Sequence, residues 1–232
     1  MAHKVWHHHG QMSEAFRTVM FLSASGGLQD AYTYIGRGKV FANAQTGNIV
    51  LMSQAAFNGD LSRVLHYLIP LLSLALGVAA AEVIHIRYRE AKHLHWRQLV
   101  LLVEILLLFG VGFIPNTLDL AANALVSFAC AMQVQAFRKV HGYPFASTMC
   151  IGNMRSGMES LVVYFHLHDK KVLHKALHYF GVILLFAFGA GVGAHCVGVF
   201  GNKTIWFSCA LLLVSLCFMF IQDEEEALKE KA

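Results

Sequence analysis

The chain has 232 residues, of which 56% are hydrophobic and 14% charged, and its mean hydropathy is +0.53. Soluble proteins carry about 25% charged residues. The composition therefore excludes an ordinary soluble domain and predicts one integral membrane domain over residues 1–232. The formal net charge of +4 is spread over the connecting segments, so we expect a lipid bilayer, and no nucleic acid, as the surroundings.

Six apolar runs follow one another along the chain, and a helix needs about 20 such residues to cross a bilayer. The segment before the first run has no apolar core ending in a small-residue cleavage site, so a cleaved signal peptide is not expected. The predicted spans are residues 18–34, 65–86, 99–114, 118–137, 180–200 and 204–221. The loops between them are too short for a soluble domain.

A polar stretch, "VFANAQTGNIVL" at residues 40–51, interrupts this pattern, and "FASTMCIGNMRS" at residues 145–156 resembles it. The glycine-asparagine pairs at Gly47 and Gly152 lie 105 residues apart, and Asp30 falls opposite Gln135 at the same offset. Small-residue runs, "ALGVAAAE" and "GAGVGAH", follow in each half. Such self-similarity predicts a duplication, with one repeat over residues 14–114 and the other over residues 117–221.

The distribution of basic residues predicts how the two polar stretches meet the membrane, because Lys and Arg collect on the cytoplasmic side. Eight crossings would place nearly equal numbers of basic residues on the two sides. Six crossings, with both polar stretches returning to the side they entered, place thirteen inside and four outside. The re-entrant arrangement is favoured, with both termini cytoplasmic.

Three crossings per repeat is an odd number, so the second repeat is expected upside down relative to the first. We therefore predict an all-α polytopic membrane protein with about six transmembrane helices in two inverted three-helix repeats. Each repeat contains a re-entrant or broken polar helix segment. Many secondary transporters have inverted repeats with broken helices near the midplane, although fold-level analogy alone does not establish function.

The polar stretches are the predicted binding site. Irregular backbone at membrane depth is tolerated where protein buries it or water lines it, and a helix that starts there favours an anionic solute. The candidate substrate-binding residues are Asp30, Asn43, Gln45, Thr46, Gly47, Asn48, Gln135, Thr148, Gly152, Asn153 and Arg155. The alternative is that these amides only join helices, as polar side chains do in membrane bundles.

Ionisable residues inside a membrane are functional candidates, because burying their charge is costly. Asp30 is the strongest, as a coupling carboxylate; alternatively it fixes helix packing, with Arg155 as its partner. Arg155 and Glu159 have the spacing of a helical ion pair, and Glu104 either faces the bundle or reaches the inner surface. The 14 histidines lack neighbouring cysteines or clustered carboxylates, so no metal site, cofactor or catalytic residue is expected, and the protein is not expected to be an enzyme.

The stretches "GGLQDAYTYIGRGKVFANAQTGNIVLM" and "AMQVQAFRKVHGYPFASTMCIGNMRSG" resemble those of the YoaK-type bacterial membrane proteins, a family catalogued as a domain of unknown function. The resemblance covers nearly the whole chain. It implies a multi-pass protein of the bacterial inner membrane with about six spans and no established substrate. In this family a threonine usually precedes the second glycine-asparagine pair, whereas Ile151 stands here.

The leading hypothesis from these observations is a secondary transporter or permease for a small solute. A membrane scaffold or regulatory protein that does not transport, in which the polar stretches serve packing, is the alternative. A channel is a third reading, and it would need no coupling carboxylate. A homo-oligomer is compatible with each of the three.

Overall fold

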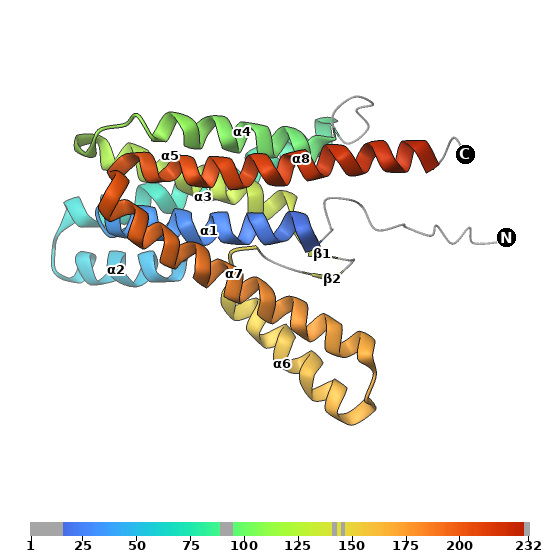
Figure 1. Ribbon diagram of the computed structural model, residues 1–232. Coiled ribbons are helices and arrows are strands. Elements are labelled where there is room, and N and C mark those ends of the chain that lie inside the picture. Colours follow the sequence, from blue (N-terminus) through green and yellow to red (C-terminus); the bar gives the residue numbers. More distant parts are fainter. Residues whose placement is uncertain (1–15, 89–94, 141–142, 145–146, 230–232) are drawn as a thin grey trace.

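The structure is a computed structural model that describes residues 16–88, 95–140, 143–144 and 147–229. Apart from one two-residue strand pair, the regular elements of these residues are helical (Figure 1). They are α1 (Phe16–Gly36), α2 (Gln45–Phe57), α3 (Leu61–Tyr88), α4 (Trp96–Val111), η2 (Asn116–Leu118), α5 (Asp119–Ala136), β1 (Lys139–Val140), β2 (Tyr143–Pro144), α6 (Cys150–Leu167), α7 (Lys170–Phe200), η3 (Gly201–Thr204) and α8 (Ile205–Lys229).

Each predicted span coincides with a helix, namely α1, α3, α4, α5, α7 and α8. Within the described residues, three helical stretches are long and apolar enough to cross a membrane by length and composition: Leu61–Tyr88, Asn116–Ala136 and Lys170–Phe220. The last of them contains α7 and the apolar part of α8. The sequence pattern therefore identified the helices correctly, and the chain is a helical membrane protein.

The two halves of the chain exchange helices rather than forming separate bundles. If α1, α2, α3 and α4 are matched with α5, α6, α7 and α8, every major contact has a counterpart. Helix α1 packs on α7 as α5 packs on α3, and α1 packs on α8 as α5 packs on α4 (Figure 1). Likewise α2 packs on α3 as α6 packs on α7, and α4 packs on α8. The packing pattern is the same when the halves are exchanged.

Glycines allow the helices to approach closely in the two most extensive helix contacts, α1 with α7 and α3 with α5. A Cβ atom on Gly27 would overlap with the carbonyl oxygen of Phe186, and one on Gly189 would overlap with that of Ala24. At the equivalent crossing of α3 and α5, a Cβ on Gly77 would overlap with the Phe128 carbonyl oxygen. Small residues let backbones approach in this way in membrane bundles. The small-residue runs seen in the sequence therefore lie at the α1–α7 and α3–α5 crossings.

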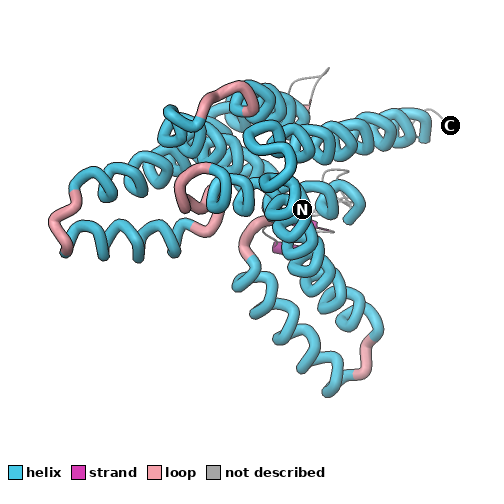
Figure 2. The backbone as a smooth tube through the Cα atoms, turned by 60° about the vertical axis from the view of Figure 1, so that its left-hand side comes forward, coloured by secondary structure: helices cyan, strands magenta, loops and turns pink. Residues whose placement is uncertain are grey.

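Helices α2 and α6 form arms with the first turns of the helix that follows each of them (Figure 2). The chain leaves α1 at Gly36, turns back along it and begins α2 beside the middle of α1. Helix α3 then starts near the point of departure, because His66 Nε2 lies 2.8 Å from the Gly38 carbonyl oxygen. In the second half, α6 begins beside the same helix, and the α6–α7 turn lies at the other end of the molecule (Figure 1).

Arg37, directly after the end of α1, is fully buried. Its guanidinium donates to the Tyr32 hydroxyl at 2.8 Å and to Asp119 Oδ1 at 2.9 Å. It also donates to the carbonyl oxygen of Ile114 at 2.7 Å. Because these partners belong to α1, to the start of α5 and to the segment after α4, Arg37 joins three elements at this end of the bundle.

Candidate functional site

The first polar stretch meets α1 at Asp30. The backbone amide of Asn43 donates to Asp30 Oδ1 at 2.7 Å, and the Asn43 side-chain amide donates to the Gly26 carbonyl oxygen at 3.3 Å. The backbone amides of Ala42 and Ala44 also face this carboxylate. Asp30 is 7% exposed. Its carboxylate therefore occupies the position at the start of α2 where exposed amides and the helix dipole favour a negative charge.

Two side chains hold the break before α2 in shape. Asn48, which is buried, accepts from the amide of Phe41 at 2.9 Å and donates to the carbonyl oxygen of the same residue at 2.7 Å. Gln45 donates to the Ala42 carbonyl oxygen at 2.8 Å. The side chain of Asn48 also donates to Gln45 Oε1 at 2.9 Å. These amides therefore satisfy backbone groups that the break leaves free.

The second polar stretch arrives at the same turn of α1. Thr148, which corresponds to Asn43 at the 105-residue offset, packs against Gly26 so closely that a Cβ there would overlap with its methyl group. Beside it, Gln133 of α5 donates to Ser147 Oγ at 3.0 Å and to the Leu22 carbonyl oxygen at 3.3 Å. The two breaks, one from each half of the chain, thus converge on the Gly26 turn.

The structure does not gather every predicted residue at this place. Gln135 lies on another face of α5 and donates to Glu82 Oε2 at 2.6 Å. Arg155 pairs with Glu159 at 3.0 Å, as its spacing indicated, and not with Asp30. Thr46 and Gly152 are exposed, whereas Asn153 is buried. Asp30, Asn43 and Thr148 therefore form the centre, with Gln45, Gly47 and Asn48 behind the first break.

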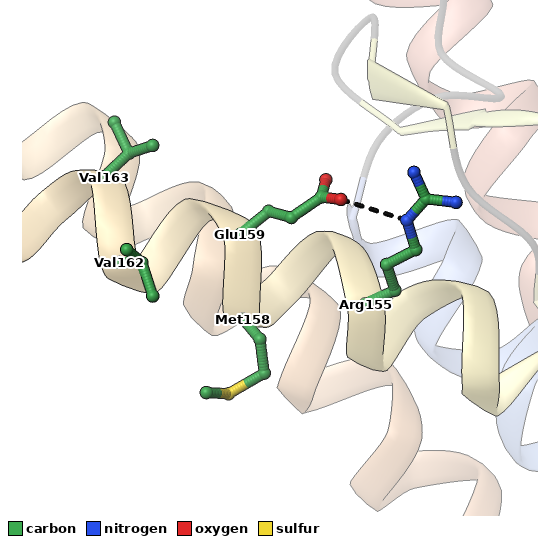
Figure 3. A pocket seen from close by; sticks show the side chains of 5 residues that line it. All are labelled: Arg155, Met158, Glu159, Val162 and Val163. Atoms are coloured by element: carbon green, nitrogen blue, oxygen red, sulfur yellow. Dashed lines mark hydrogen bonds and ion pairs between the residues drawn. The ribbon is translucent and has the colours of Figure 1, made fainter.

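A shallow groove of about 530 Å³ runs along the outer face of α6 and is lined by Arg155, Met158, Glu159, Val162 and Val163 (Figure 3). Two of these lining residues, Arg155 and Glu159, form an ion pair (Figure 3). Both side chains are largely exposed. This groove faces away from α7 and is separate from the convergence at Gly26.

Sequence reasoning missed the partners of Gln29, one residue before Asp30. The Gln29 side chain is fully buried and lies among Ser25, Glu104, Cys130 and Ser208, which come from α1, α4, α5 and α8. The four-residue spacing of Ser25 and Gln29 on one helical face was the available signal. The remaining partners come from segments 75 to 179 residues away, so no local pattern indicates them.

Unpartnered acceptors flank the Gly26 turn. Asn43 Oδ1 and Gln133 Oε1 are buried and have no hydrogen-bond donor. Together with the Asp30 carboxylate they offer acceptors and negative charge. Among the described residues, no group of three or more His, Cys, Asp or Glu side chains could hold a metal ion. The chemistry available here is hydrogen-bond acceptance in a largely buried place between two helix starts.

Helices from the two halves pack against one another, and polar breaks meet inside the bundle of this multi-helix membrane protein. The chain belongs to the family described as "Protein of unknown function (DUF1275)", whose model matches residues 18–218. It is 25% identical over 209 residues to the UPF0700 transmembrane protein YoaK of Bacillus subtilis (strain 168), covering 85% of this chain and 92% of that protein. No solved structure matches the chain. The resemblance seen in the two polar stretches is therefore confirmed.

Proposed function

We propose that the protein is a secondary transporter for a small solute in the bacterial inner membrane. The observation that carries this proposal is the convergence of two chain breaks, one from each half, on the Gly26 turn of α1. Asn43 reaches it from one side and Thr148 from the other. Broken helices that meet near the midplane at a repeat interface are the usual substrate sites of such transporters.

The topology that goes with this function has six crossings in two inverted repeats. Asn43 lies beside Gly26, ten residues before α1 ends at Gly36. Ten helical residues rise about 15 Å, which is about half of the hydrocarbon thickness. The first break would therefore reach the middle of the membrane and return. Two observations support the inversion. The α2–α3 turn and the α6–α7 turn lie at opposite ends of the molecule (Figure 1), and basic residues are in excess on one side.

The charges at the centre favour a neutral or cationic solute with N–H donors. From the sequence, the start of α2 indicated an anion. In the structure the Asp30 carboxylate occupies that place. A second anion would meet its charge at short range. A donor-bearing solute would instead find Asp30, Asn43 Oδ1 and Gln133 Oε1 as acceptors, two of which have no partner within the protein.

A non-transporting scaffold or regulatory protein is the second candidate, and one observation favours it. The hydrogen bonds of Asn48 and Gln45 all go to the first break itself. These side chains are therefore explained by packing alone. The two candidates differ in what they predict for Asp30, because a packing role needs no ligand at the Gly26 turn.

The deciding experiment is a thermal-shift screen of the purified protein, since a solute that binds only the folded state raises its apparent stability. The probes are ammonium, methylammonium, neutral amides, amino acids and simple carboxylates. We expect N–H donors to raise the unfolding temperature of the wild type and to lose this effect in Asp30→Asn. Glu159→Gln, which removes an exposed carboxylate on α6, is the matched control and should respond as the wild type does.

A probe found in this way is then tested for uptake into proteoliposomes. Asp30→Asn should abolish accumulation driven by an ion gradient. The transporter proposal fails if no probe shifts the wild type, or if Asp30→Asn responds and accumulates as the wild type does. The scaffold candidate would then remain.

A further inference from the structure

Four helices converge on one side-chain amide next to the proposed site. Gln29 Nε2 donates to Ser25 Oγ at 3.0 Å, to Ser208 Oγ at 2.9 Å and to Glu104 Oε1 at 3.3 Å. The two serine hydroxyls lie 2.6 Å apart, and the Cys130 thiol donates to Gln29 Oε1. All five side chains are buried, and Glu104 is 0% exposed. We call these five residues the Glu104 cluster.

Glu104 has too few hydrogen-bond donors around it to stabilise an ionised carboxylate. The Gln29 amide has two N–H groups for three acceptors, and its longest contact goes to Glu104 Oε1. The other carboxyl oxygen, Oε2, is buried without a donor. A carboxylate would thus receive one long hydrogen bond from a neutral amide. An ionised carboxylate left in this way costs several kcal/mol.

The charged and titratable groups around α4 do not compensate. Helix α1 brings Gln29 and the acidic Asp30, α5 brings the Cys130 thiol, and α8 brings Cys209 beside Ser208. The basic side chains lie at the two ends of α4. His85 of α3 and Arg97 contact Trp96 in its first turn, and Arg37 reaches the Val111 carbonyl oxygen at its end. Within the described part of the chain, no cationic side chain pairs with Glu104.

We propose that the Glu104 cluster is a proton-binding site, in which Glu104 carries one proton in this conformation. The carboxyl O–H bond breaks and the proton passes to solvent water only when α4 separates from α1 and α8. This separation lets water reach and hydrate the carboxylate. The bound proton thereby stabilises the packed arrangement of these three helices.

A proton fits this cluster better than a metal cation does. The amide hydrogens of Gln29 point at the same oxygens that a cation would need as ligands. The serine oxygens are at hydrogen-bond distance, 2.6 Å, which leaves no room for an ion between them. The positions that a cation would need beside these oxygens are therefore already taken by N–H and O–H groups.

This inference goes beyond the transport proposal and does not depend on it. If the protein transports, Glu104 becomes the candidate carrier of a coupled proton, and that further role rests on the proposed function. The protonation itself concerns only the folded protein. If no solute raises the unfolding temperature, the transport proposal fails, but the proposal of a proton site is unaffected.

The first test compares the pH dependence of the unfolding temperature in the wild type and Glu104→Gln. The native state holds a proton that the unfolded state releases at lower pH, so wild-type stability should fall as the pH rises above the ordinary glutamate range. Glu104→Gln should show a smaller fall than the wild type, and the control Glu159→Gln should keep the wild-type fall. An equal fall in Glu104→Gln and the wild type would overturn the proposal.

The second test needs no variant of Glu104 to fold. Infrared spectra of the wild type at neutral pH should contain the carbonyl stretch of a protonated carboxyl group. Ser208→Ala should shift this band, because the hydroxyl helps to set the hydrogen bonds of the cluster. Absence of the band, or a band that Ser208→Ala leaves unchanged, contradicts the proposal. A sodium-specific rise in stability, measured against choline chloride and lost in Glu104→Gln, would assign the site to sodium instead.

Discussion

Asp30 and Gln135 show how accurately an internal repeat in the sequence predicts the position of a single side chain. The 105-residue offset matched the two, yet Gln135 contacts Glu82, and Gln133 faces the second break. Each residue turns a helix by about 100°, so a two-residue difference moves a side chain to another face. Equal spacing in the sequence could identify the equivalent helices and could not fix their rotation.

Asn48 allows a test of what the amides in the first break do. Asn48→Ala removes both hydrogen bonds to the Phe41 backbone. Unsatisfied buried groups cost about 1–3 kcal/mol each, so we expect a clearly lower unfolding temperature in detergent. Thr46→Ala, two residues earlier at an exposed position, should unfold as the wild type does. Equal stability of the two variants would show that the break needs no such support.

At the scale of elements, the apolar runs predicted the helices well, because a span of about 20 apolar residues has few other stable forms in a bilayer. The sequence could not predict which helices are neighbours. The sequence predicts that Glu104 faces either the bundle or the inner surface. Its cluster with Gln29 and Ser208 forms only when α1, α4 and α8 are assembled. Long-range packing decides such contacts, and no local pattern encodes it.

The crossing of α1 and α7 can be tested with glycines that differ only in position. Gly189→Ala should separate the helices, because its Cβ would overlap with the backbone of Ala24. Overpacking costs about 1–3 kcal/mol or more. Gly191→Ala, on the same helix with no atom within 4 Å of the new Cβ, is the matched control. If the unfolding temperatures of both variants equal that of the wild type, this crossing does not depend on close backbone contact.

At the scale of the whole molecule, the two arms end on opposite sides of the bundle, and this permits a direct test of the proposed topology. Exposed residues at the two arm turns are Asn58 and Lys170. A membrane-impermeant maleimide should label Asn58→Cys in intact cells. Lys170→Cys should react only after the cells are permeabilised, and the parent protein gives the background from its own cysteines. Labelling of both positions from one side would contradict inverted repeats.

The exchange of helices between the halves also has a consequence for how the protein is made. Helix α1 is synthesised first, but Gly27 meets its partner on α7 only after about 160 further residues have followed. Until then the face of α1 that carries Gly27 lacks the α7 backbone on which it packs in the complete protein. The first half would therefore remain incompletely packed, in the insertion machinery or among lipids, until α7 is inserted. A ribosome that stalls before α7 would release a product that quality-control proteases can degrade.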